Sequence, residues 1–156
     1  FTVGYTDSRA TILPARDGIG HGNIKRSAKA PNCSFFTNWT SAGDKITWDI
    51  EVAKSGNYEA VVYYTCPNAD VGSTVQLGFG GSAAAGKVTE GHNPPLVGAA
   101  FDRAPRGSES YVKDFSPLRL GILAMKEGRG ELTLSARDVP GGKVMDVRAV
   151  ALKLLK

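Results

Sequence analysis

The chain of 156 residues has the length of one domain and is long enough to bury a sizeable core. Its 19 glycines and 8 prolines, together with 42% hydrophobic residues, indicate many short elements joined by tight turns rather than a disordered chain. The net charge of +4 comes from lysines and arginines spread along the chain, which disfavours nucleic acid as a partner and favours an anionic ligand. No apolar run approaches the roughly 20 residues needed to span a bilayer.

The beginning of the chain suggests a piece of a longer polypeptide. Phe1 follows neither an initiating methionine nor a signal peptide, so we expect a cut made inside a larger protein. Residues 1–12 are expected to form a linker or an entry arm, and residues 13–156 the module itself. The first strand of the module is predicted within residues 13–18, where it ends in a turn at Gly18.

Two strands are predicted around a turn at residues 55–57. Apolar and polar residues alternate from Ile46 to Val52 and again after the turn, as in strands with one face in a core and the other in water. Trp48 shares the apolar phase, which predicts a core position. Tyr63 and Tyr64 point to opposite faces, and Tyr63 is the better candidate for the wetted face.

The remaining sequence predicts more short strands separated by turns. Strand character occurs at residues 74–79, 87–89, 114–120, 122–125, 132–136 and 144–155. Residues 91–110 are rich in proline and glycine and are predicted to form a long loop. No segment of ten or more residues has the 3.6-residue period of a helix. About eight short strands therefore indicate an all-β antiparallel sandwich or barrel.

An aromatic loop precedes the two paired strands. Phe35, Phe36 and Trp39 lie among serine, threonine and asparagine and have no periodic partners. Large rings in an irregular polar loop are candidates for ligand recognition. For Trp39, packing within the loop and contact with a ligand are equally good interpretations.

The two cysteines flank this informative stretch. Cys33 and Cys66 could form a disulfide that stabilises the fold by roughly 3–4 kcal/mol in the chain-entropy model, and two buried free thiols are an equally good interpretation. Neither His21 nor His92 forms a ligand cluster with them, so no zinc site is expected. No other cofactor is expected either. The carboxylates are scattered, and no nucleophile elbow, P-loop or zinc signature is present, so the chain is not expected to be an enzyme.

The order of these features resembles a known family. The aromatic loop is followed by a W-x-I-x-V strand, a G-x-Y turn, L-x-L-G-x-L, G-x-G-x-L-x-L and a closing V-M-D-V-x-x-V-x-L strand. This order resembles the galactose-binding-like jelly-roll sandwich of carbohydrate-binding modules of the sixth and thirty-fifth families. The segments LPARDG, KRSAKAPNCSFFTNWTS, YYTCPNADVGST and ESYVKDFSPLRLG look still more like the C-terminal accessory module of planctomycete-type bacterial sulfatases. The resemblance covers about residues 13–155.

The resemblance implies a sugar site at one end of the sandwich. In related modules, two aromatic rings stack on the sugar and an asparagine of the last strand binds its hydroxyls. Phe36, or the neighbouring Phe35, matches the first ring, and Tyr111 approximately matches the second, while Val144 stands where the asparagine would be. Arg103 and Arg106 in the long loop suit sulfate or carboxylate groups, and a surface loop with scattered charge is the alternative.

The resemblance also implies a structural calcium ion bound by a glutamate of the first strand and an aspartate of the last. Asp146 matches the aspartate, but Arg16 stands in place of the glutamate. A guanidinium group repels calcium and can pair with a carboxylate through two hydrogen bonds. We therefore predict an Arg16–Asp146 ion pair and no metal ion.

Two functions follow as hypotheses. The first is a non-catalytic carbohydrate-binding module of an extracellular bacterial enzyme, by resemblance a sulfatase, that is secreted, periplasmic or attached to the cell surface. It would hold the enzyme near an anionic or sulfated polysaccharide through six side chains: Phe36, Trp39, Tyr111, Arg103, Arg106 and Lys113. The second is a structural accessory domain that packs on the upstream catalytic domain and binds no sugar.

Overall fold

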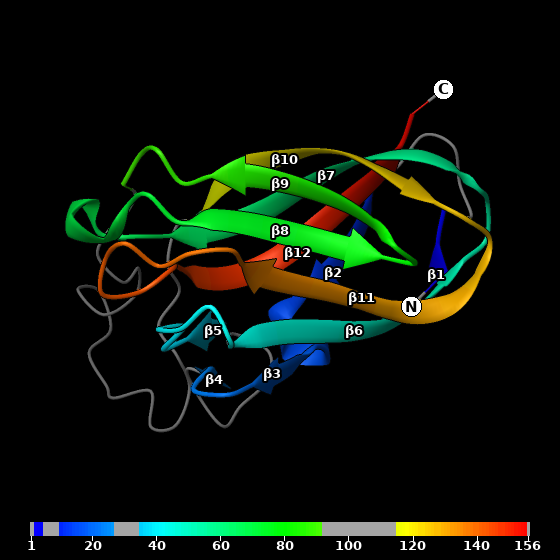
Figure 1. Cartoon of the computed structure of the whole chain (residues 1–156). Helices are drawn as coiled ribbons and strands as arrows, with labels where there is room; N and C mark the ends of the chain where they lie inside the picture. The colour runs from blue at the N-terminus through cyan, green and yellow to red at the C-terminus, as the bar shows by residue number, and fades with distance from the viewer. Residues whose placement is uncertain (1, 5–9, 27–34, 92–114, 156) are drawn as a thin grey trace, which may run out of the picture.

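The computed structural model describes residues 2–4, 10–26, 35–91 and 115–155, and these form two sheets that pack face to face (Figure 1). The first, sheet A, contains β1 (Thr2–Val3), β3 (Ile19–His21), β6 (Lys45–Val52), β8 (Thr74–Phe79), β9 (Ser82–Lys87) and β11 (Gly128–Ala136). The second, sheet B, contains β2 (Thr11–Pro14), β4 (Lys25–Arg26), β5 (Phe36–Thr37), β7 (Gly56–Thr65), β10 (Ser116–Met125) and β12 (Asp146–Leu154). Two short 3-10 helices lie at Ala15–Asp17 (η1) and Asn68–Asp70 (η2). The predicted all-β sandwich is confirmed.

The chain crosses between the two sheets, as in a jelly roll. Sheet A has the order β1-β6-β11-β8-β9, with β3 also on β6, and sheet B has the order β10-β7-β12-β5-β4, with β2 on β12. Consecutive long strands such as β6 and β7, or β10 and β11, therefore belong to opposite sheets. All pairings among the described strands are antiparallel except that of β1 with β6.

The three connections at residues 53–55, 80–81 and 126–127 lie at one end of the sandwich, which we name the turn end (Figure 1). The connections before β6, after β7 and between β11 and β12 lie at the other end, named the loop end. The expected aromatic loop belongs to the loop end. The turn end therefore consists of tight turns, and the loop end consists of longer connecting segments.

The core lies between the sheets and is lined by the apolar phase of each strand. Trp48 is buried as predicted, and its indole N–H donates to the carbonyl of Pro14 at 3.0 Å. Tyr58 is also fully buried, and its hydroxyl donates to the carbonyl of Lys54. Tyr64 is buried whereas Tyr63 is half-buried on the outer face, so the predicted division of these two rings is confirmed.

Several elements differ from the sequence-based expectation. Residues 116–125 form one strand instead of two, because a bulge with Leu120 as the extra residue lets the ladder continue past Gly121, whose φ is +120°. The strand expected at residues 87–89 lies earlier, over β9. The strands β3, β4 and β5 were not predicted, since elements of two or three residues are too short to show a period.

The segment expected as an arm is packed on the module where the structure describes it. Thr2–Val3 pairs with the end of β6, and the Val3 side chain is fully buried. Gly4 has a φ of +83°, and a Cβ there would collide with the hydroxyl of Tyr58. The arm therefore needs glycine at this point to pass the core. Thr11 and Ile12 open β2 and pair with β12.

Near the turn end, the Phe79 ring lies so close to the backbone of Gly130 that a side chain at residue 130 would not fit. A Cβ on Gly130 would lie 2.8 Å from Cε1 of Phe79, so the aromatic ring occupies the space that a side chain would need. We expect Gly130→Ala to lower the free energy of unfolding by about 1–3 kcal/mol, because Phe79 has to leave its packed position. Chemical denaturation followed by tryptophan fluorescence measures this.

Gly78→Ala is the matched control, since a Cβ there meets nothing closer than the carbonyl oxygen of Ser82 at 3.6 Å. This variant is expected to change the free energy of unfolding by less than about 0.5 kcal/mol. Equal losses from the two variants would show that the contact between Phe79 and Gly130 does not decide the effect.

Candidate functional site

The aromatic loop at the loop end packs its rings inward. Phe36 is 3% exposed and Trp39 is 1% exposed, although both were expected to contact a sugar. Phe36 is held there because β5 pairs with Val147 of β12 on one side and with Arg26 of β4 on the other. The prediction that a sugar stacks on Phe36 or Trp39 is therefore wrong, because both rings are buried in the core.

Further contacts hold this loop in place. The Arg26 guanidinium lies 5.4 Å from the centre of the Phe36 ring and donates to the carbonyl of Gly18 at 3.0 Å. The Phe35 ring packs edge-on against Phe115 at 5.4 Å. Among the described residues, the indole N–H of Trp39 has no hydrogen-bond partner.

A buried carboxylate organises the backbone beside these rings. Asp44 is 4% exposed and accepts hydrogen bonds from the backbone N–H groups of Asn23, Thr40 and Ser41 at 2.9, 3.3 and 3.2 Å. A carboxylate that satisfies three backbone donors has a structural role. The loop is thus ordered from within, and Asp44 is not presented to a ligand.

Asp146 lies at the start of β12 and accepts a hydrogen bond from the Thr37 hydroxyl at 2.8 Å. The backbone of η1, which contains Arg16, packs against β12. The side chain of Arg16 lies outside the described part, so the Arg16–Asp146 ion pair stays a prediction. In the described ranges no three histidine, cysteine or acidic residues gather as metal ligands. Val144 is fully buried, and its N–H donates to the carbonyl of Trp39 at 2.8 Å.

The remaining predicted site residues cannot be placed. Tyr111, Arg103, Arg106 and Lys113 fall in residues 92–114, outside the described residues, as does His92, and Cys33 falls in residues 27–34, which the structure does not describe either. Their roles stay predictions. None of the helices in the part of the chain that the structure describes is both long and apolar enough to cross a membrane.

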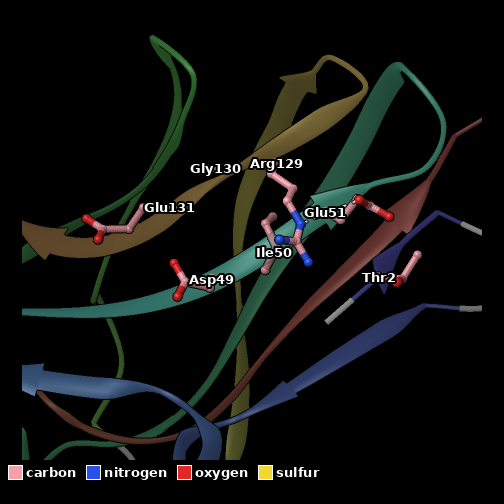
Figure 2. Close-up of a pocket in the computed structure, with 7 residues that line it drawn as sticks. All are labelled: Thr2, Asp49, Ile50, Glu51, Arg129, Gly130 and Glu131. Atoms are coloured by element: carbon pink, nitrogen blue, oxygen red, sulfur yellow. Dashed lines mark ion pairs between the residues drawn. The ribbon is translucent and has the colours of Figure 1, made fainter.

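A polar groove of about 560 Å³ crosses the outer face of sheet A instead (Figure 2). Figure 2 shows the carboxylates of Asp49 and Glu51 on β6 beside Arg129 and Glu131 on β11. The ladder places Arg129 directly opposite Glu51 and Glu131 directly opposite Asp49, while Thr2 of β1 closes the groove on the far side of β6. We name this surface the face groove.

The face groove keeps its polar groups accessible. Nε of Arg129 lies 3.6 Å from a carboxylate oxygen of Glu51, and these side chains are 87% and 53% exposed. An ion pair so exposed contributes only about 0–1 kcal/mol to stability. Its guanidinium and carboxylate therefore keep most of their capacity to bind hydroxyl groups of a ligand.

Sequence reasoning missed these residues, although their signal was present. Asp49 and Glu51 belong to the polar phase of the strand predicted from Ile46 to Val52, whereas Arg129 lies outside every strand predicted from the sequence. Only the pairing of β6 with β11 shows that two distant polar phases form one surface.

A buried thiol lies beneath the loop end. Cys66 is free and fully buried, and burial raises the pKa of its thiol to about 11. The carboxylates of Asp70 and Asp146 act in the same direction, while Lys143 opposes them. Burial also raises the pKa of neighbouring Tyr64, whose hydroxyl donates to the carbonyl of Glu90 at 2.8 Å.

Comparison with protein-family models and with curated proteins gives no match. Among solved structures, the fold is similar to a family 35 carbohydrate-binding module from Clostridium thermocellum, with a TM-score of 0.57 and 12% identity over 95% of this chain and 100% of that one. It is also similar to the C-terminal family 6 module of a marine laminarinase from Zobellia galactanivorans, with a TM-score of 0.62 and 9% identity over 93% and 99% of the two chains.

Larger proteins contain the same fold as one part. A mannanase from Podospora anserina with a family 35 module matches at a TM-score of 0.61 and 14% identity, over 94% of this chain and 28% of the enzyme. This chain thus spans only about a quarter of the length of that enzyme. At such identities the similarity establishes a shared jelly-roll fold.

The raised pKa of Cys66 predicts a dependence of stability on pH. Above its ordinary pKa of 9.0 the thiol ionises in the unfolded chain but stays protonated in the folded one until about pH 11. Between pH 9 and pH 11 the unfolded state therefore binds fewer protons than the folded state. The stabilisation that comes from the protonated Cys66 is complete below pH 9, and the free energy of unfolding falls as the pH rises to 11. Thermal midpoints across this range measure it.

Cys66→Ala provides the control for this effect, because it removes the titrating group. Its midpoint should fall less steeply between pH 9 and pH 11 than that of the parent chain. Below pH 9, iodoacetamide should label Cys66 only in denaturant. Parallel pH curves, or rapid labelling of the folded chain at Cys66, would contradict the prediction.

Proposed function

We propose that this chain is a non-catalytic carbohydrate-binding module of a larger carbohydrate-active enzyme. The observation that carries the proposal is the shared fold with isolated sugar-binding modules over nearly the full length of both chains. The face groove adds a surface on which several polar side chains converge. The module would keep its parent enzyme close to a polysaccharide.

The face groove has the chemistry that hydroxyl groups require. Carboxylate oxygens of Asp49, Glu51 and Glu131 accept hydrogen bonds, and the guanidinium of Arg129 donates them. Adjacent strands lie about 4.8 Å apart, and alternate residues on one strand lie about 6.8 Å apart, so these groups form a fixed grid. A rigid grid of acceptors and one donor suits a ring that carries several hydroxyls.

Charge distinguishes two classes of polysaccharide. Three carboxylates and one guanidinium line the face groove, so a sulfated chain would be repelled there and an uncharged chain favoured.

An anionic or sulfated ligand and a sulfatase parent remain proposals supported by the basic residues Arg103, Arg106 and Lys113 and by the sequence resemblance. A secreted, periplasmic or cell-surface location belongs to the same proposal.

A structural accessory domain is the second candidate, and one surface favours it. The outer face of sheet B carries the exposed side chains of Ile12 and Ile122 and the half-buried Val61 and Tyr63. Arg119 lies directly opposite Val61, and Glu59 directly opposite Ile122, so charged side chains interrupt this apolar surface. A face of mixed apolar and charged groups suits packing on a parent catalytic domain. Deletion of the module would then destabilise the parent enzyme without loss of any sugar binding.

Removal of the donor from the face groove tests the first candidate. Arg129→Ala should lower the affinity for a bound polysaccharide about tenfold or more, because a charged hydrogen bond to a hydroxyl is lost. Affinity electrophoresis on β-1,3-glucan, β-1,4-glucan and β-1,4-mannan, and on a carrageenan before and after desulfation, measures binding to each class.

Arg119→Ala is a closely matched control on the opposite sheet. Arg119 also forms an exposed ion pair between strands, with Nε 3.5 Å from Glu59, but it lies outside the face groove. It should leave polysaccharide binding unchanged. Binding to no polysaccharide would reject the sugar-binding proposal, and equal losses from both variants would reject the face groove as its location.

A further inference from the structure

A second hollow, of about 600 Å³, lies at the turn end and has a different character from the face groove. The buried side chains of Phe79 at the end of β8 and Met125 at the end of β10, which are 8% and 2% exposed, form its apolar floor. Polar side chains also line it, those of Ser55, Asn57 and Ser82 among them. We name it the turn-end pocket. An apolar surface among hydrogen-bonding groups is the usual construction of a ligand site.

Glycines keep the turn-end pocket open. Gly80 and Gly81 form a two-residue hairpin turn with φ values of +57° and +88°, and Gly128 begins β11 with a φ of +128°. A Cβ at any of these three positions would meet nothing within 4 Å, so no neighbouring atom fills the space beside them. Left-handed backbone favours glycine at all three positions, and two of them, Gly80 and Gly128, line the pocket without a side chain.

One hydrogen bond holds the wall of the turn-end pocket. The N–H of Glu127 in the β10–β11 connection donates to the Ser55 hydroxyl in the β6–β7 connection at 2.7 Å. Two turns that are 72 residues apart in sequence are thereby fastened to each other. A pocket whose rim is built from fastened turns is largely formed before a ligand binds.

The turn-end pocket is continuous with the face groove. Arg129, Gly130 and Glu131 line both hollows, so the first residues of β11 separate and connect them. The face groove reaches from Thr2 of β1 across β6 to β11, and the turn-end pocket continues past β11 to Phe79 of β8. Three strand spacings correspond to about 14 Å, which exceeds the width of one sugar ring.

We propose that the face groove and the turn-end pocket bind one extended, uncharged oligosaccharide of more than two sugar rings. A disaccharide would fill the face groove, and the rings that follow it would enter the turn-end pocket past Arg129. This proposal rests on the proposed sugar-binding function and deepens it. The hydroxyls of the rings in the turn-end pocket would bind the polar groups of Ser55, Asn57 and Ser82, while those of the rings in the face groove would bind its carboxylates.

The charges along the combined surface favour an uncharged ligand. Four carboxylates line it, those of Asp49, Glu51, Glu127 and Glu131, against the two cations Lys126 and Arg129. This surface is therefore acidic although the chain as a whole has a net charge of +4. A sulfated chain would meet repulsion along this path, whereas hydroxyl groups find acceptors along it.

A bulky side chain placed in the turn-end pocket tests the proposal. Ala124 is exposed and lines the pocket, and Ala83 is equally exposed on β9 outside it, so Ala124→Trp and Ala83→Trp form a matched pair. Calorimetric titration with the disaccharide and the hexasaccharide of the laminari-, cello- and manno- series gives the affinities. In the parent chain the hexasaccharide should bind about tenfold or more tightly than the disaccharide.

Ala124→Trp should reduce the affinity for the hexasaccharide to that for the disaccharide and leave the disaccharide unchanged, while Ala83→Trp should alter neither. Unchanged thermal midpoints show that both variants fold. Binding that does not depend on chain length, or a hexasaccharide affinity that Ala124→Trp leaves intact, would overturn the extended ligand while sugar binding stands. If no member of the three series binds, the ligand is not an uncharged oligosaccharide of these types. Binding of the sulfated or desulfated carrageenan would then show that the proposed sugar-binding function still holds, and binding of neither would reject that function as well.

Discussion

The pairing of β6 with β11 is the constraint on which the rest of this structure depends. The register places Leu132 opposite Trp48 on the core side and Arg129 opposite Glu51 on the outer side. Since side chains alternate along a strand, a shift by one residue would turn Trp48 outward and bring the carboxylates of β6 into the core. The same ladder therefore maintains the core and assembles the face groove, and neither can change without the other.

The two ends of the sandwich differ in what they contribute: the loop end stabilises the fold, and the turn end leaves surface exposed. At the loop end, Asp44 satisfies backbone donors, and the aromatic rings of Phe36 and Trp39 fill the core. At the turn end, short connections with glycine leave a hollow beside Phe79. Burying large rings stabilises a loop, but it removes the exposed ring faces that stacking on a sugar needs. Open polar surface in the described part of the chain lies on sheet A and around the turn end.

A module of this construction suits recognition by hydrogen bonds more than recognition by stacking. The carboxylates and the arginine of the face groove lie on two paired strands, so their spacing does not depend on loop motion. An exposed ion pair such as Arg129–Glu51 adds little to stability, which leaves these side chains available for a hydroxyl-rich ligand. The fold shared with carbohydrate-binding jelly rolls is compatible with this use of a sheet face.

The sequence by itself determined the class of fold, the core position of Trp48 and the division between Tyr63 and Tyr64, because alternation is a local property that can be seen within one strand. It could not determine the burial of Phe36 and Trp39, since a loop without a period contains no signal of what covers it. Nor could it bring β6 and β11 together, because strand pairing between residues about 80 positions apart depends on the whole sheet. Tertiary structure alone decided that Asp49, Glu51, Arg129 and Glu131 share one surface.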